Sequence, residues 1–279
     1  MSRPFISAAR TLYRAIPLQP LRRVIYGTYA ALVRGRRATT TIDGVTLDLD
    51  LSEVIDLSLY LQQYEPDVTN AINSYTRPGM VVLDIGANIG AHTLRFAKIV
   101  GRGGRVIAFE PTDFAFAKLR RNLALNDFPQ VVPVQVALSD EELPPQDVNF
   151  RASWQTDGSR KDGVTRVAFE RLDDRLERMG IGRVDLIKID VDGNEFRLMV
   201  GGRRMIERDR PLMLMEAVGP HFDDDSRNPY RILRDIGYRF WLLKGGREVT
   251  VEEMRDMLPR NDERMTTSFN VLAAVNHPS

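Results

Sequence analysis

The sequence predicts an α/β fold of the Rossmann-like type, with a doubly wound, mostly parallel seven-stranded sheet and an antiparallel last strand. From residue 80 onward, short apolar runs alternate with helical segments, as in a parallel sheet with helices on both faces. The apolar runs do not alternate with polar residues, which suits strands buried on both faces. A glycine-containing turn links the first of these strands to the helix that follows it.

The chain is expected to divide into a basic N-terminal arm, residues 1–38, and one domain, residues 39–279. Within the domain we expect a hairpin and a helix over residues 39–79, a core over 80–279 and an inserted hairpin over 141–170. Asp43 and Gly44 mark the turn of the first hairpin, because this pair favours a two-residue β-turn. The expected strands are 81–85, 105–109, 131–136, 184–189, 211–215, 238–243 and 267–275, and the expected helices are 57–75, 91–100, 113–126, 194–207 and 226–236.

The composition excludes several classes of protein. Lys and Arg number 39 against 38 Asp and Glu, so the net charge of +1 does not indicate a nucleic-acid partner. Cysteine is absent, which excludes disulfides, thiolate metal sites and iron–sulfur clusters. No apolar run reaches the roughly 18 residues of a transmembrane helix, and the start of the chain makes a poor signal peptide. We therefore expect a cytoplasmic protein.

The N-terminal arm is basic. Every charged residue before Asp43 is an arginine: Arg3, Arg10, Arg14, Arg22, Arg23, Arg34, Arg36 and Arg37. Two interpretations stay open. A helix in the arm packs one face against the core, or the arm rests on an anionic membrane surface and places the protein at the periphery of the inner face of the membrane.

The turn after the first core strand is typical of a nucleotide-binding site. Its sequence is Asp84-Ile85-Gly86-Ala87-Asn88-Ile89-Gly90. At such a turn the end of a strand and the start of a helix direct N–H groups and a positive dipole at a ligand. Glu110 ends the next strand about 20 residues on, where a carboxylate accepts hydrogen bonds from ribose hydroxyls. Asn88 replaces the middle glycine of the dinucleotide fingerprint, so pyrophosphate binding is disfavoured. An NAD(P)-dependent oxidoreductase and a degenerate cofactor-binding or scaffold protein remain the alternatives.

The spacing Asp-x-Gly-x-Asn-x-Gly, followed by an acidic residue after the second strand, resembles the S-adenosylmethionine-binding motif of class I methyltransferases. Further stretches resemble the FkbM family of methyltransferases, in family order over residues 80–217: Phe109-Glu110-Pro111, Arg121-Asn122-Leu123-Ala124-Leu125-Asn126, Ala137-Leu138-Ser139-Asp140, Arg171-Leu172-Asp173-Asp174, Ile187-Lys188-Ile189-Asp190-Val191-Asp192-Gly193-Asn194-Glu195 and Leu214-Met215-Glu216. One departure is Asp192, where the family more often has Glu.

This resemblance implies S-adenosyl-L-methionine as the cofactor. The glycine turn would contact the methionine portion, Glu110 would hold the ribose, and Ala137 and Leu138 would border the adenine. The implied cofactor-binding residues are Asp84, Gly86, Ala87, Asn88, Gly90, Glu110, Pro111, Ala137, Leu138 and Asp190.

The candidate catalytic residues follow the fourth and fifth strands. Methyl transfer requires an in-line nucleophile and a group that takes its proton. Asp190 is the first candidate, because it ends the fourth strand opposite the glycine turn, and Glu216, His221 and Asp192 follow. Stabilisation of a helix N-terminus is an alternative role for Asp192. His92 lies just after the glycine turn, where packing or lining of the cofactor site is an alternative to a catalytic role.

No spacing in the sequence requires a metal, although Asp190, Asp192, Glu216 and His221 offer ligands for a divalent ion. Cytosine-C5 methylation is excluded, since it needs a cysteine nucleophile. The Asn/Asp-Pro-Pro-Tyr/Phe motif of amino-methylating enzymes is absent after the fourth strand, where the chain reads Asp190-Val191-Asp192-Gly193. Oxygen is the favoured target, and the FkbM resemblance implies a hydroxyl of a sugar, glycan, glycolipid or natural product.

Overall fold

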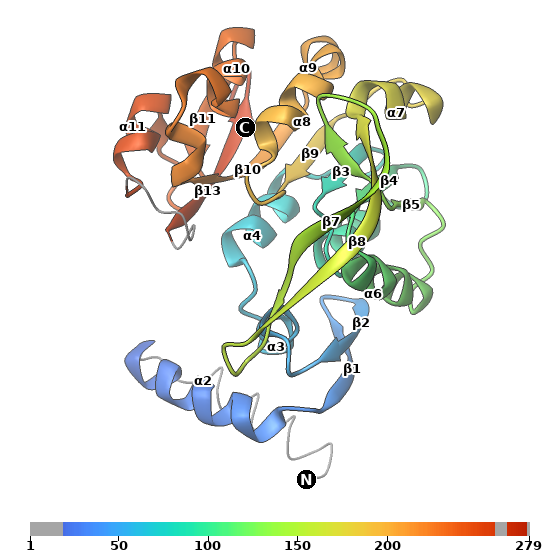
Figure 1. The fold of residues 1–279 in the computed structure, drawn as a ribbon, viewed down its shortest axis with the longest axis vertical. Coiled ribbons are helices and arrows are strands. Elements are labelled where there is room, and N and C mark those ends of the chain that lie inside the picture. The colour runs from blue at the N-terminus through green and yellow to red at the C-terminus, as the bar shows by residue number, and fades with distance from the viewer. Residues whose placement is uncertain (1–18, 260–266, 278–279) are drawn as a thin grey trace.

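A computed structural model of the protein describes residues 19–259 and 267–277. Its core is an eight-stranded sheet with the order β12-β11-β13-β10-β9-β3-β4-β5 (Figure 1). The strands are β3 (Val81–Ile85), β4 (Arg105–Phe109), β5 (Val131–Val134), β9 (Leu186–Ile189), β10 (Leu212–Val218), β11 (Arg239–Leu242), β12 (Glu248–Val249) and β13 (Ser268–Ala274).

The sheet is mostly parallel, as the sequence predicts. β3 pairs in parallel with β4 and β9, and β5 and β10 extend the parallel set on either side. The last strand, β13, is antiparallel to both β10 and β11. The predicted count of seven strands is wrong by one, because β12 adds to the edge beside β11. That strand has two residues, Glu248 and Val249, too few to produce a periodic pattern.

Helices cover both faces of the sheet, so the fold is doubly wound. Val82 belongs to a cluster with Phe96 of α5, whereas the next residue of the same strand, Leu83, belongs to a cluster with Leu176 of α7 and Leu198 of α8. The helices of the domain are α3 (Val54–Tyr60), α4 (Pro66–Tyr75), α5 (Ala91–Val100), α6 (Asp113–Ala124), α7 (Leu172–Arg178), α8 (Glu195–Gly201), α9 (Arg203–Asp209), α10 (Pro229–Ile236) and α11 (Val251–Asp256), with short 3-10 turns η1 (Gly219–Phe222) and η2 (Asp225–Arg227).

The N-terminal hairpin forms as predicted, from β1 (Arg37–Ile42) and β2 (Val45–Asp50). Asp43 and Gly44 have φ values of 50° and 80°, as a tight hairpin turn requires. The helix before it, α2 (Gln19–Val33), buries Tyr29 and Val33 in one cluster with residues of β2. The second half of the basic arm therefore packs against the domain, and residues 1–18 lie outside the described residues.

Two predicted helices are each divided in two. The segment 57–75 forms α3 and α4, because Gln62 and Glu65 between them adopt left-handed φ values of 57° and 39°. The segment 194–207 forms α8 and α9, which meet at Gly202. At the end of α8 a side chain on Gly201 would place its Cβ 1.9 Å from the backbone oxygen of Ser139, so glycine allows a close contact with β6 (Ala137–Ser139).

The inserted hairpin is present and spans residues 143–171. β7 (Leu143–Trp154) and β8 (Arg160–Arg171) pair antiparallel, and β6 joins β8 to make a three-stranded sheet. The hairpin runs across the domain toward α3 (Figure 1). At its tip the Thr156 N–H donates to the Ser52 oxygen at 2.8 Å, and Glu53 pairs with Gln155. The insertion thus connects the core to the N-terminal region.

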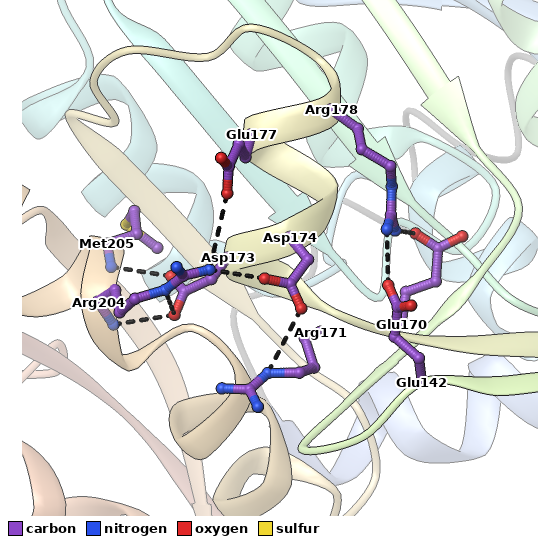
Figure 2. Close-up of polar contacts among 9 residues, drawn as sticks. All are labelled: Glu142, Glu170, Arg171, Asp173, Asp174, Glu177, Arg178, Arg204 and Met205. Atoms are coloured by element: carbon purple, nitrogen blue, oxygen red, sulfur yellow. Dashed lines mark hydrogen bonds and ion pairs between the residues drawn. The ribbon is translucent and has the colours of Figure 1, made fainter.

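The contact between α7 and α9 depends on the buried Asp173 (Figure 2). One carboxylate oxygen accepts the Met205 N–H at 2.9 Å, and the other accepts the Arg204 N–H at 3.0 Å. Gly202 precedes α9 and has no side chain that can cap it. Asp173 supplies the missing cap from a different helix.

Candidate functional site

The predicted site residues converge where the strand order of the sheet reverses. β4 and β5 lie on one side of β3 and β9 lies on the other. A crevice at this position is where open α/β sheets bind ligands. The turn from Gly86 to Gly90 follows β3, Glu110 follows β4 and Asp190 follows β9.

The glycine turn is sterically required. Gly86 and Gly90 have φ values of 76° and 88°, and Asn88 between them has 49°. A Cβ on Gly86 would lie 1.7 Å from the backbone oxygen of Asp190, so a side chain there would separate β3 from β9. The N–H groups of Gly86 and Ala87 both donate to the Phe109 oxygen, at 3.0 and 2.9 Å, which fixes the turn against β4.

Glu110 joins the loops that follow β3 and β4. One carboxylate oxygen accepts the Asn88 N–H at 2.9 Å, and the other accepts the N–H and hydroxyl of Thr112 at 2.9 and 2.6 Å. Burial raises the pKa of Glu110, and the hydrogen bonds from Thr112 and Asn88 oppose that rise in part. Its carboxylate lies against the glycine turn, and its contact with a ribose stays a prediction.

The residues predicted to surround the adenine lie further along the same side. Pro111 is half-buried directly after Glu110. Ala137 and Leu138 are buried in β6, after β5 has ended at Val134, so they belong to the three-stranded sheet and not to the third core strand. Their contact with a cofactor stays a prediction.

A buried lysine lies beneath the crevice. The Lys188 ammonium donates to the Gly86 oxygen at 3.1 Å and to the Asp190 carboxylate at 3.2 Å, and lies 3.9 Å from Asp84. Burial alone would lower the pKa of Lys188, but the charges of Asp190, Asp84 and Glu65 outweigh burial and raise it. Lys188 therefore stays protonated.

Asp84 is fully buried at the base of the turn. One of its oxygens accepts the Thr93 hydroxyl at 2.6 Å. The other has no hydrogen-bond partner among the residues that the structure describes. This oxygen faces the Lys188 ammonium at 3.9 Å, which is beyond hydrogen-bond distance.

A small cleft lies beside β9, β10 and β13. It is lined by Glu65, Val68, Lys188, Ile189, Asp190, Leu214, Glu216 and Asn270. Burial, followed by the charge of Asp190, raises the pKa of Glu216 to about 7, against a smaller opposing effect of a hydrogen bond with Ser268. The cleft thus holds one carboxyl group that gains and loses a proton near neutral pH.

The structure does not bring all four predicted catalytic residues together. Asp190 and Glu216 share the cleft, but Asp192 is exposed in the turn between β9 and α8. His221 is buried, its Nε2 lies 2.6 Å from Glu195, and its Nδ1 faces the Val218 N–H at 3.4 Å. Both ring nitrogens of His221 already have protein partners. A catalytic role for Asp192 or His221 stays a prediction.

Sequence reasoning missed the segment between α3 and α4. His92 Nε2 lies 2.7 Å from the Glu65 carboxylate, and the Tyr64 ring stacks on His92 with centroids 5.4 Å apart. The sequence predicts an uninterrupted helix here, which would not place Glu65 at the cleft. Pro66 was the available signal, since proline favours the first turn of a helix and restricts the residue before it.

No group of three or more His, Asp or Glu side chains is arranged to hold a metal ion within residues 19–259 and 267–277.

The arrangement of the strands identifies the fold class of the protein. A doubly wound sheet with a glycine turn after its first strand and an antiparallel last strand inserted beside β10 is the class I methyltransferase fold. Residues 84–265, more than half of the chain, match the family model described as the methyltransferase FkbM domain. The chain belongs to the FkbM methyltransferase family.

Several relatives are similar over part of the chain. The 2-O-methyltransferase NoeI of Sinorhizobium fredii is 30% identical over 153 residues, which cover 48% of this chain and 62% of that protein. The 31-O-demethyl-FK506 methyltransferase FkbM of Streptomyces tacrolimicus is 30% identical over 158 residues, covering 45% of this chain and 60% of that protein. The chain thus spans about three fifths of the length of these relatives.

Among solved structures, the methyltransferase FkbM from Methylobacillus flagellatus aligns with 96% of this chain and 58% of that chain, with a TM-score of 0.45 and 16% identity.

Proposed function

We propose that this protein transfers the methyl group of S-adenosylmethionine to a hydroxyl oxygen of a sugar, glycan, glycolipid or natural product. Family membership supports the reaction class. The names of the relatives support oxygen as the target, since one is a 2-O-methyltransferase and another acts on 31-O-demethyl-FK506. The carboxyl group of Glu216 in the cleft is the observation on which the proposal depends.

The charge of the site fits this cofactor. Asp84, Asp190 and Glu65 face the single ammonium of Lys188, and one Asp84 oxygen lacks a hydrogen bond. Bound S-adenosylmethionine would supply the methyl group on a sulfonium and bring a second cation, its α-ammonium. Lys188 is the one cation among the residues described as lining the cleft and faces several carboxylates, so the two phosphates of a dinucleotide would meet a net negative charge.

Glu216 is the residue best suited to take the acceptor proton. A general base works best when its pKa lies near the working pH, and the pKa of Glu216 is raised to about 7. Asp190 is already paired with Lys188 at 3.2 Å, so it suits orientation of the acceptor and electrostatic stabilisation. We therefore rank Glu216 ahead of Asp190, the reverse of the order favoured by the sequence.

The test is release of S-adenosylhomocysteine on methyl transfer to a panel of hydroxyl-bearing sugars and natural products. Glu216→Gln should lower turnover by about 10²-fold or more, while affinity for S-adenosylhomocysteine is kept. Asp235→Asn on the exposed side of α10 is the matched control and should act as wild type. If Glu216→Gln turns over at the wild-type rate, or if the methyl group is found on nitrogen, the proposal is wrong.

Contact with a membrane and the absence of a nucleic-acid partner remain expectations. Across the described part of the chain, none of the helices combines the length and the apolar character needed to cross a bilayer.

A further inference from the structure

We propose that Glu65, anchored by His92, binds the α-ammonium group of the methyl donor and so selects a donor that carries its amino-acid portion. This inference rests on the proposed function. It assigns a binding role to a residue outside the methyltransferase motifs, in the link between α3 and α4.

The position of Glu65 follows from the order of the strands. If Glu110 holds the ribose after β4, a donor that extends along the edge of the sheet passes over β3 and reaches β9. Neighbouring strands lie about 4.8 Å apart, so these two steps match the length of the donor beyond its ribose. The cleft at β9 is lined by Glu65, Ile189 and Asp190.

Glu65 contacts the buried His92 and also lines the cleft. Its side chain is 31% exposed, whereas that of His92, 2.7 Å away, is 6% exposed. His92 lies in the first turn of α5, directly after the glycine turn, so the anchor belongs to the same element as the predicted donor site. Burial would raise the pKa of Glu65, but the hydrogen bond from His92 and the nearby charges outweigh it and lower that pKa. The carboxylate is therefore anionic at neutral pH.

The other carboxylates at this edge are less suited to an ammonium ligand. Asp190 is hydrogen-bonded to Lys188, and Asp84 is fully buried beneath the turn. Glu216 is the carboxyl group proposed to take the acceptor proton, and its raised pKa of about 7 makes it a poorer partner for an ammonium group. Glu65 also adopts a left-handed φ of 39°, which is uncommon outside glycine and places its side chain at the cleft instead of in a helix.

The test compares two ligands by calorimetry. S-adenosylhomocysteine carries the α-ammonium, and 5′-methylthioadenosine lacks the amino-acid portion. Glu65→Gln should weaken S-adenosylhomocysteine binding roughly 10- to 100-fold, as expected for loss of a charge-assisted hydrogen bond. The same variant should bind 5′-methylthioadenosine as tightly as the wild type does.

Asp127→Asn is the control, because it removes one negative charge at an exposed residue that pairs with Arg102 and does not line the cleft. It should leave both affinities unchanged. Equal loss of both ligands in Glu65→Gln, or no loss of either, would overturn the inference. If the wild type binds neither ligand, the proposed function itself fails.

Discussion

Lys188 explains how the site tolerates several carboxylates in a small volume. Its ammonium contacts the glycine turn through the Gly86 oxygen and the end of β9 through Asp190. Replacing it would leave Asp84 and Asp190 facing each other without a counterion, which is costly in a buried site. Lys188 lies within residues 187–195, which resemble the FkbM family, but a lysine in an apolar strand does not indicate which carboxylates it contacts.

The raised pKa of Glu216 predicts that this carboxyl group lowers the stability of the folded protein at neutral pH, although the proposed activity requires it. This carboxyl ionises above pH 4.5 in the unfolded chain but only above about pH 7 in the folded protein. Folding is therefore progressively penalised as pH rises between these values, and the penalty is complete above the higher one. Glu216→Gln should raise the free energy of unfolding at about pH 8 by about 1–3 kcal/mol.

Chemical denaturation at a series of pH values measures this effect. The gain of Glu216→Gln should shrink as pH falls and vanish below about pH 4.5, where the wild-type carboxyl is protonated in both states. A gain that does not depend on pH would show that the substitution acts through packing and not through the charge.

Glu110 allows a second residue-scale prediction. Glu110→Ala should weaken S-adenosylhomocysteine binding by about 1–3 kcal/mol in calorimetry, because hydrogen bonds from the ribose to a carboxylate are lost. Asn88 and Thr112 also lose their acceptor. A melting curve must therefore show that the variant is folded. Unchanged affinity in a folded variant would remove Glu110 from the site.

Some site residues were predictable because they lie at or near the carboxyl end of a strand: Asp190 follows β9, and Glu216 lies two residues before the end of β10. Asp190 and Glu216 could be paired from sequence because the ends of neighbouring parallel strands meet at one edge of the sheet. Glu65 and His92 are 27 positions apart and meet through a break in a helix, which no local pattern encodes.

At the scale of elements, strong periodicity gave correct boundaries. β3 and α5 begin and end at the predicted residues, since a buried strand and an amphipathic helix flank a glycine turn. Asn126 lies two residues after the end of α6. In the structure its amide accepts the Thr46 N–H and donates to the Thr46 oxygen, at 2.9 and 2.8 Å, which docks β2 onto α6. Such a contact between segments 80 positions apart could not be derived from local pattern.

Asp173 carries a prediction at this scale. Asp173→Ala should lower the free energy of unfolding by about 1–3 kcal/mol, because two N–H groups at the start of α9 lose their acceptor in a buried setting. Denaturation in urea measures the loss, and Asp174→Ala is the control, since its contacts are exposed side-chain pairs (Figure 2). Affinity for S-adenosylhomocysteine should not change. An equal effect of both substitutions would contradict the capping role.

At the scale of the whole molecule, the N-terminal region is integrated with the core. Lys118 of α6 forms a buried ion pair with Asp56 of α3, and the tip of the inserted hairpin reaches Ser52. Tyr29 and Val33 of α2 are buried. Deleting the basic arm through α2 would therefore expose a hydrophobic cluster, so a test of the arm has to keep this helix.

The three arginines that precede α2 in the sequence allow such a test. Changing Arg3, Arg10 and Arg14 to Gln together should reduce co-sedimentation with anionic vesicles, since each basic residue near the surface contributes about 1 kcal/mol. Binding of S-adenosylhomocysteine should be unaffected, because the site residues lie from Glu65 onward. If the intact protein does not sediment with such vesicles, the membrane hypothesis is wrong.

The central claim is that the crevice beside β3 binds S-adenosylmethionine and not a dinucleotide. Thermal unfolding of the full chain with S-adenosylhomocysteine or with NAD⁺ tests it most directly. A ligand present at 100 times its dissociation constant adds about 2.7 kcal/mol to the stability of the native state. We predict a concentration-dependent rise in melting temperature with S-adenosylhomocysteine and none with NAD⁺. Stabilisation by NAD⁺ alone would contradict the account.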